Sequence, residues 1–200
     1  MHKQKHLEKN SLIRLAVFGA ATLLFVSLSI VGLMRNSQGA VDRYERLLAV
    51  DKAGGDVETA LNDLRGYIYS HMNTQIGSEL GINPPIQLKY TYERLVAAEE
   101  ERVSNINSEL EPEAIAFCEA QNPSGFSGRF RLDCIEQYKD ENGAKIQPIE
   151  DDFYKFDFVP PRWSADLAGF SILLAIAFGI SFVLQLLLYI RMRNKVQYGN

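Results

Sequence analysis

The 200-residue sequence contains few of the residues that carry chemistry: two cysteines, three histidines and one tryptophan. It has no Walker A loop, Gly-rich dinucleotide loop, G-x-S-x-G elbow or H-E-x-x-H helix. Outside the first fourteen residues the only histidine is His71, with no acid or nucleophile at a recognisable spacing. We therefore expect a protein that is not an enzyme, with no catalytic, cofactor-binding or metal-binding residues.

Charge is missing from two long stretches, the twenty residues 15–34 and the twenty-four residues 167–190. Helices of these lengths would extend about 30 and 36 Å, and the hydrocarbon core of a bilayer is about 30 Å thick. The sequence therefore predicts a mainly α membrane protein with two transmembrane helices. A cleaved signal peptide is the alternative for the first stretch, but its apolar region would be long, and Gln38 occupies a position where cleavage requires a small residue.

The charged residues predict an orientation for these helices. The two tails, residues 1–14 and 191–200, each have a net charge of +3, whereas residues 35–166 have a net charge of −10. Basic residues that flank membrane spans stay in the cytoplasm. We expect both termini to be cytoplasmic, on tails too short for an output domain, and the acidic segment to lie outside the plasma membrane. Its negative charge argues against nucleic acid as a partner.

The segment 35–166 is predicted to be an α+β domain that begins with helices. Two helical pieces cover residues 39–72, separated by Gly54-Gly55, with Asp56 as the N-cap of the second piece. A third helix is expected over residues 88–110, after a glycine- and proline-containing loop over residues 77–85.

A small antiparallel sheet is expected after these helices. Large residues alternate with polar ones over residues 130–138, and Asn142-Gly143 is a strong hairpin signal. Residues 144–149 are the expected return strand, and residues 154–158 allow a third strand.

The cysteines, Cys118 and Cys134, both lie in the segment expected outside the cytoplasm, where a disulfide is the usual state of such a pair. Closing a loop of this size stabilises a fold by about 3 kcal/mol in the chain-entropy model. Free thiols and a redox-active pair are the alternatives, although redox pairs usually have the C-x-x-C spacing.

The stretch before the second apolar segment contains residues that end regular structure, residues typical of a membrane interface, and a residue that can cap a helix. The prolines at 160–161 cannot continue a helix. Arg162 and Trp163 are residue types found at the membrane interface, although a carbohydrate or lipid platform is an alternative reading. Ser164 is the predicted N-cap, and Asp166 falls in the first turn, where the helix dipole favours a negative charge.

Small and polar residues recur on one face of each predicted span, and such faces let membrane helices approach closely. In the second span these residues are Ser171, Ala175 and Gly179, with Gln185 at the edge; in the first they are Ala16, Ala20 and Ser27. We expect the two faces to pack together or against another subunit; a chance pattern is the alternative.

Two functions fit these features. The first is a non-catalytic subunit or scaffold of a membrane complex, whose partners are the lipid bilayer and a membrane or extracytoplasmic protein or a second copy of the chain. The second is a sensory input module, because a span, a helical outer domain and a returning span resemble, in layout only, the input half of chemoreceptors and sensor kinases. Such a sensor would need a separate partner to carry its signal.

Overall fold

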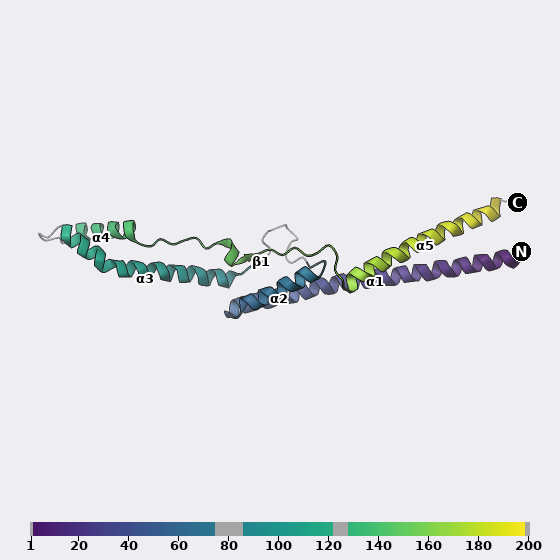
Figure 1. Ribbon diagram of the computed structural model, residues 1–200, viewed down its shortest axis with the longest axis horizontal. Helices are drawn as coiled ribbons and strands as arrows, with labels where there is room; N and C mark the ends of the chain where they lie inside the picture. The colour runs from purple at the N-terminus through teal and green to yellow at the C-terminus, as the bar shows by residue number, and fades with distance from the viewer. Residues whose placement is uncertain (1, 75–85, 122–127, 199–200) are drawn as a thin grey trace. The chain divides into compact units, whose positions relative to one another are not determined.

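A computed structural model describes residues 2–74, 86–121 and 128–198 of the chain. The fold is mostly helical, with two helices long and apolar enough to cross a membrane and a small antiparallel sheet (Figure 1). It divides into two compact units. The first consists of Met1–Val50, Asp56–Ile86 and Asp157–Asn200, and the second of Asp51–Gly55 and Gln87–Phe156.

Helix α1 (His2–Ala53) is a single helix of 52 residues, about 78 Å long at 1.5 Å per residue. The sequence predicted one helix over residues 15–34 and another beginning at residue 39. The structure joins them, because residues 35–38 contain neither proline nor glycine to interrupt the backbone hydrogen bonds. Gly54, whose φ of +68° favours glycine, follows the end of α1 as predicted.

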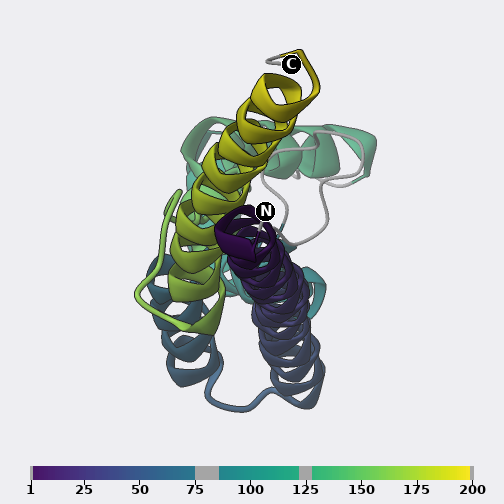
Figure 2. The same cartoon turned by 90° about the vertical axis from the view of Figure 1, so that its right-hand side faces the viewer.

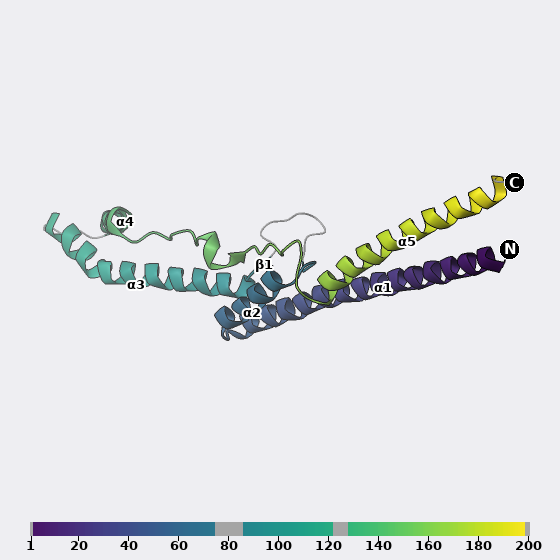
Figure 3. The same ribbon diagram turned by 45° about the vertical axis from the view of Figure 1, so that its right-hand side comes forward.

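Helix α2 (Val57–Ser70) begins as the sequence predicted. Asp56 is its N-cap, and the carboxylate accepts hydrogen bonds from the backbone amide of Thr59, at 3.0 Å, and from its hydroxyl, at 2.7 Å. The helix lies beside α1 (Figures 1 and 3). The apolar core of the first unit is built from the facing sides of these two helices, with buried side chains that include Ala40, Leu47, Leu61, Leu64 and Ile68.

Helix α5 (Leu167–Tyr198) completes the first unit. The candidate spans are Lys9–Ala53 of α1 and Leu167–Asn194 of α5, with mean hydropathies of 2.2 and 2.5 in their most apolar windows. Only 11% and 17% of these windows are buried, so neither helix is the covered core helix of a globular fold. Both chain ends lie at the same end of this unit (Figures 1 and 2).

The second unit is a helical hairpin followed by an extended segment. Helix α3 (Lys89–Gln121) packs against α4 (Arg129–Asn142) (Figure 3). The chain then passes through a 3₁₀ turn, η1 (Asp151–Phe153), into strand β2 (Lys155–Phe156). This strand pairs with β1 (Ile86–Gln87), the short strand that precedes α3.

The hairpin predicted over residues 130–149 is wrong. Residues 129–142 form α4, and Gly143 is its C-cap, whose amide donates to the Lys139 carbonyl at 2.7 Å. An Asn-Gly pair is common at the end of a helix as well as in a β-turn. In addition, every second large residue of an alternating pattern is four positions from the last, which is also the spacing of residues on one face of a helix. The loop predicted over residues 77–85 lies outside the described residues.

Residues 144–149 are extended but form no strand, which corrects the predicted return strand. Side chains of α3 hold this segment in place of a strand partner. Asn107 accepts a hydrogen bond from the Ala144 amide, at 2.8 Å, and donates one to the Ala144 carbonyl, at 3.2 Å. Pro148 cannot donate to a ladder. Of the third predicted strand, only β2 is present.

Candidate functional site

Three parts of the first unit meet in a small polar cluster, which we call the junction cluster: Asn36, Met72, Ser164 and Asp166. The Asn36 amide donates to the Asp166 carboxylate, at 2.7 Å, and to the Met72 carbonyl, at 3.1 Å. The Met72 amide donates to the Ser164 hydroxyl, at 3.0 Å, and that hydroxyl donates to Asp166, at 2.8 Å. Asn36, Met72 and Ser164 are buried. The cluster ties α1 to the segment after α2 and to the start of α5.

Asp166, and not Ser164, is the N-cap of α5. Its carboxylate accepts a hydrogen bond from the Gly169 amide at 2.9 Å, as a cap does. Ser164 is turned toward Met72 instead, so the predicted cap is wrong by two residues. Burial raises the pKa of Asp166, but the hydrogen bonds from Gly169, Asn36 and Ser164 together lower it below its ordinary value. The cluster therefore holds a negative charge at the positive end of the α5 dipole.

The backbones of α1 and α5 approach closely beside this cluster. A Cβ atom on Gly32 would lie 2.7 Å from the Ala168 nitrogen and 2.8 Å from its Cα. At Gly179 the same atom would meet only a methyl group of Thr22, at 3.8 Å. Of these two glycines, Gly32 therefore lies at the closer contact between the two helices.

The two helices pack along a seam in which residues recur at alternating spacings of three and four, as in left-handed helix pairs. Asn36 bonds Asp166, Gly32 lies against Ala168, and the rings of Phe25 and Phe178 stack with centroids 5.3 Å apart. The seam residues are Thr22, Phe25, Ser29, Gly32 and Asn36 on α1, and Ala168, Ser171, Ala175, Phe178 and Phe182 on α5, all buried or half-buried.

Only one of the two predicted faces lies in this seam, and packing of the other against another subunit stays a prediction. On α5, Ser171 is buried, and Ala175, Gly179 and Gln185 are half-buried. On α1, however, Ala16, Ala20 and Ser27 are all exposed, and the Ser27 hydroxyl is bonded to the Leu23 carbonyl of its own helix. The prediction was based on small residues spaced four or seven apart. The seam instead contains small, polar and aromatic residues. The alternating spacing of three and four was the signal that could have revealed it.

Arg162 and Trp163 lie in the turn before α5, and both are exposed. The Trp163 ring packs edge-on against Phe170, with centroids 5.9 Å apart, and so covers part of the first turn of α5. Their place at a membrane interface stays a prediction.

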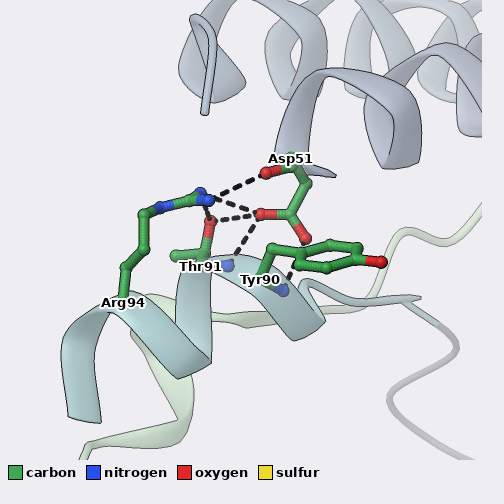
Figure 4. Close-up of polar contacts among 4 residues, drawn as sticks. All are labelled: Asp51, Tyr90, Thr91 and Arg94. Carbon is green, nitrogen blue, oxygen red and sulfur yellow. Dashed lines mark hydrogen bonds and ion pairs between the residues drawn. The ribbon is translucent and has the colours of Figure 1, made fainter. Parts of the chain in front are cut away.

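In the second unit, Asp51 caps the N-terminus of α3 from a distant part of the chain (Figure 4). Leu88, the residue just before α3, has no side-chain acceptor for the orphan amides of the first turn. The Asp51 carboxylate accepts from the amides of Tyr90, at 3.0 Å, and Thr91, at 2.8 Å, and from the Thr91 hydroxyl, at 2.6 Å. Its side chain is 1% exposed.

Arg94 completes this arrangement (Figure 4). One guanidinium nitrogen lies 3.1 Å from the Asp51 carboxylate, and the other donates to the Asp51 carbonyl at 2.9 Å. The buried carboxylate thus has hydrogen bonds and a cation, which together offset the cost of burying its charge. Sequence reasoning missed Asp51; the lack of a capping residue before α3 was the available signal.

The structure joins Cys118 and Cys134 in a disulfide between α3 and α4. Cys118 is fully buried, and the rings of Phe117 and Tyr138 pack beside the bridge with centroids 4.8 Å apart. Lys139 pairs with Glu111 at 3.1 Å on the same pair of helices. Neither cysteine is a free thiol in the described part of the chain.

Two carboxylates of the second unit, Glu99 and Asp151, are held by neighbouring side chains. The Glu99 side chain, 15% exposed, binds Arg102 at 2.7 Å and accepts from the Gln147 amide at 2.8 Å. These hydrogen bonds lower the pKa of Glu99 from 4.5 to about 2. Hydrogen bonds from Lys155 and Tyr154 lower the pKa of Asp151 as well. In residues 2–74, 86–121 and 128–198, no group of three or more His, Cys, Asp or Glu side chains could hold a metal ion.

No protein-family model matches the chain, and neither a curated protein nor a solved structure is significantly similar to it.

Proposed function

We propose that the chain is a non-catalytic integral membrane protein, a subunit or scaffold that presents its acidic segment outside the cytoplasm. In this proposal, residues 15–34 and 167–190 cross the plasma membrane and both termini are cytoplasmic. One observation carries it: α1 and α5 expose large apolar side chains along their length, including Leu23 (71%), Val17 (59%) and Ile180 (58%). Exposed apolar surface of this extent is stable in lipid and a liability in water.

Cysteine labelling tests the topology. The native cysteines are bridged, so wild-type protein provides the blank for an impermeant maleimide. A cysteine at Gln137, exposed on α4, should be labelled in intact cells, whereas one at Asn194, near the C-terminal end of α5, should react only after the membrane is opened. Labelling of Asn194→Cys from outside would refute the proposed orientation, and release of the chain by carbonate washing would refute the spans.

A partner is the second part of the proposal. Tagged protein purified in mild detergent should carry a second protein, or a second copy of itself, in a fixed ratio measured by light scattering and mass spectrometry. The variant Cys118→Ser/Cys134→Ser provides the comparison. Loss of the partner from this variant places the contact on the outer domain, whereas equal recovery places it elsewhere. A monomer with no bound protein would contradict the subunit proposal.

A sensory input module is the second candidate, and the unbroken α1 favours it. A helix that continues from the predicted span into the outer part of the first unit can pass a displacement along its axis without a flexible link. The two proposals differ in their partners: a sensor requires a signalling protein whose output changes with an external ligand, whereas a scaffold does not.

A further inference from the structure

A hollow of about 350 Å³ opens on the second unit, between the two-stranded sheet and the first turns of α3. It is lined by Gln87, Lys89, Tyr92, Tyr154 and Lys155. Sites for small molecules have volumes of about 300–1,000 Å³ and combine ring or apolar walls with a few polar groups. The hollow uses neither the junction cluster nor the residues around Asp51, so it is a separate feature of the fold.

The fold brings these side chains together for local reasons. The Leu88 amide donates to the Tyr154 carbonyl at 2.9 Å. The next pair along the two strands, Gln87 and Lys155, is therefore a non-hydrogen-bonded pair, in which side chains lie closest. Lys89 and Tyr92 are three residues apart on α3 and share one helix face.

The aromatic part of the hollow consists of the rings of Tyr92 and Tyr154, which meet at an angle and which we call the tyrosine corner. Tyr92 and Tyr154 have centroids 4.6 Å apart and planes inclined by 46°. The Lys155 ammonium lies 5.0 Å from the centre of the Tyr154 ring and is paired with Asp151. Lys89 lies 3.7 Å from Glu93 in a pair exposed on both sides.

Two lining groups are free to bind a ligand. Within the described part of the chain, neither the side-chain amide of Gln87 nor the Tyr92 hydroxyl has a hydrogen-bond partner. The Lys89–Glu93 pair is exposed, and exposed pairs contribute little to stability. The Lys89 ammonium can therefore turn to an anion at small cost, while Lys155 remains a fixed cation beside Asp151.

We infer that this hollow binds an acidic sugar, a pyranose ring that carries a carboxylate, such as a uronic acid unit of a glycan. The ring C–H face would lie on the tyrosine corner, hydroxyls would meet the Gln87 amide and the Tyr92 hydroxyl, and the carboxylate would pair with Lys89.

Other ligand classes match fewer of these groups. A neutral sugar would make no use of the Lys89 ammonium, which is held in an exposed pair with Glu93. An aromatic acid would cover the Gln87 amide and the Tyr92 hydroxyl without bonding them, and a covered polar group that loses its water costs free energy. A simple carboxylate has no ring to place on Tyr92 and Tyr154.

Saturation-transfer difference NMR on the full chain in mild detergent tests the inference. The probe is sodium glucuronate, and the comparison compounds are glucose, benzoate and acetate. Ring protons of glucuronate should show saturation transfer, with a dissociation constant on the order of 1 mM. Glucose and benzoate should give signals several-fold weaker, and acetate none.

Variants separate this site from adventitious contact. Tyr92→Ala and Lys89→Ala should each reduce the glucuronate signal several-fold, Tyr92→Phe should reduce it less, and Lys89→Arg should keep it. Tyr69→Ala and Lys145→Ala are the matched controls, because neither residue lines the hollow, and circular dichroism checks that each variant is folded.

Three results would overturn the inference: no transfer to glucuronate, equal transfer to glucose or benzoate, or a glucuronate signal that Tyr92→Ala and Lys89→Ala leave unchanged. The inference does not rest on the proposed function. The labelling and partner experiments can fail while glucuronate binding holds, and binding can fail while the topology holds.

Discussion

The carboxylate of Asp51 accepts hydrogen bonds from both the backbone amide and the hydroxyl of Thr91, forty residues further along the chain. Helix caps are usually supplied by the residue just before the helix. Here that position is Leu88, and the cap comes from the last turn of α1 instead. The start of α3 therefore depends on a residue outside α3.

Asp51→Ala should lower the free energy of unfolding by about 2 kcal/mol, because it removes a helix cap and leaves buried donors unpaired. Asp51→Asn should cost less, since its amide oxygen can still accept one of these bonds. Denaturant unfolding in mild detergent measures the loss, and hydrogen exchange at the Tyr90 and Thr91 amides localises it. Asp42→Ala, an exposed position on α1, should stay within about 0.5 kcal/mol of wild type. Equal stability of the Asp51 and Asp42 variants would contradict the capping role.

The two glycines between α1 and α5 should respond differently to the same change. Gly32→Ala places a methyl group within 3 Å of the Ala168 backbone, so the helices must separate and thermal stability in detergent should fall. Gly179→Ala fits against Thr22 at 3.8 Å and should be neutral or stabilising, because alanine favours a helix by about 1 kcal/mol over glycine. Melting temperatures that fall equally in both variants would show that the seam is packed differently.

The disulfide should be detectable as the absence of free thiol in protein denatured without reductant, and reduction should release two thiols. Cys134→Ser should lower the free energy of unfolding by about 3 kcal/mol, the value expected for a loop of this size. The double variant Cys118→Ser/Cys134→Ser should be at least as unstable as the single one, because both lack the bridge. Free thiols in fresh protein would exclude the bond.

Glu99 gives the second unit a specific dependence on pH. Its folded-state pKa is lowered from 4.5 to about 2, so its stabilising contribution is present above pH 4.5 and is lost as pH falls toward 2. NMR titration of the Glu99 carboxyl carbon should show this low pKa, and Arg102→Gln should raise it, because Arg102 supplies the largest hydrogen-bonding effect. Arg129→Gln, on α4, should leave it unchanged. A Glu99 pKa near 4.5 in wild type would rule out its bonds to Arg102 and Gln147.

Features carried by neighbouring residues could be predicted from the sequence. The apolar stretches are uninterrupted, Asp56 is followed by Thr59 at capping distance, and Gly54 can adopt the positive φ that follows a helix. These signals are local, and no distant residue competes with them.

Features that depend on residues far away in the sequence could not be predicted. The pattern over residues 130–138 fits both a strand and a helix. In the helix, this part of the chain makes contacts with α3, such as the pair of Lys139 with Glu111. Ser164 and Asp166 are both good caps by residue type, and the choice between them follows from Asn36 and Met72. The partnership of Asp51 with Thr91 has no signature in either stretch alone.

The continuity of α1 makes its length as constrained as its residue types. One amino acid inserted between Phe25 and Gly32 would rotate every later position of the helix by about 100° relative to the earlier ones. Asn36 would then point away from Asp166 while Phe25 still faced Phe178. An insertion of seven would restore the direction, since it adds nearly two whole turns, but would shift Asn36 by about 10 Å along the axis. Insertions and deletions in this stretch should therefore be tolerated less than substitutions on its exposed side.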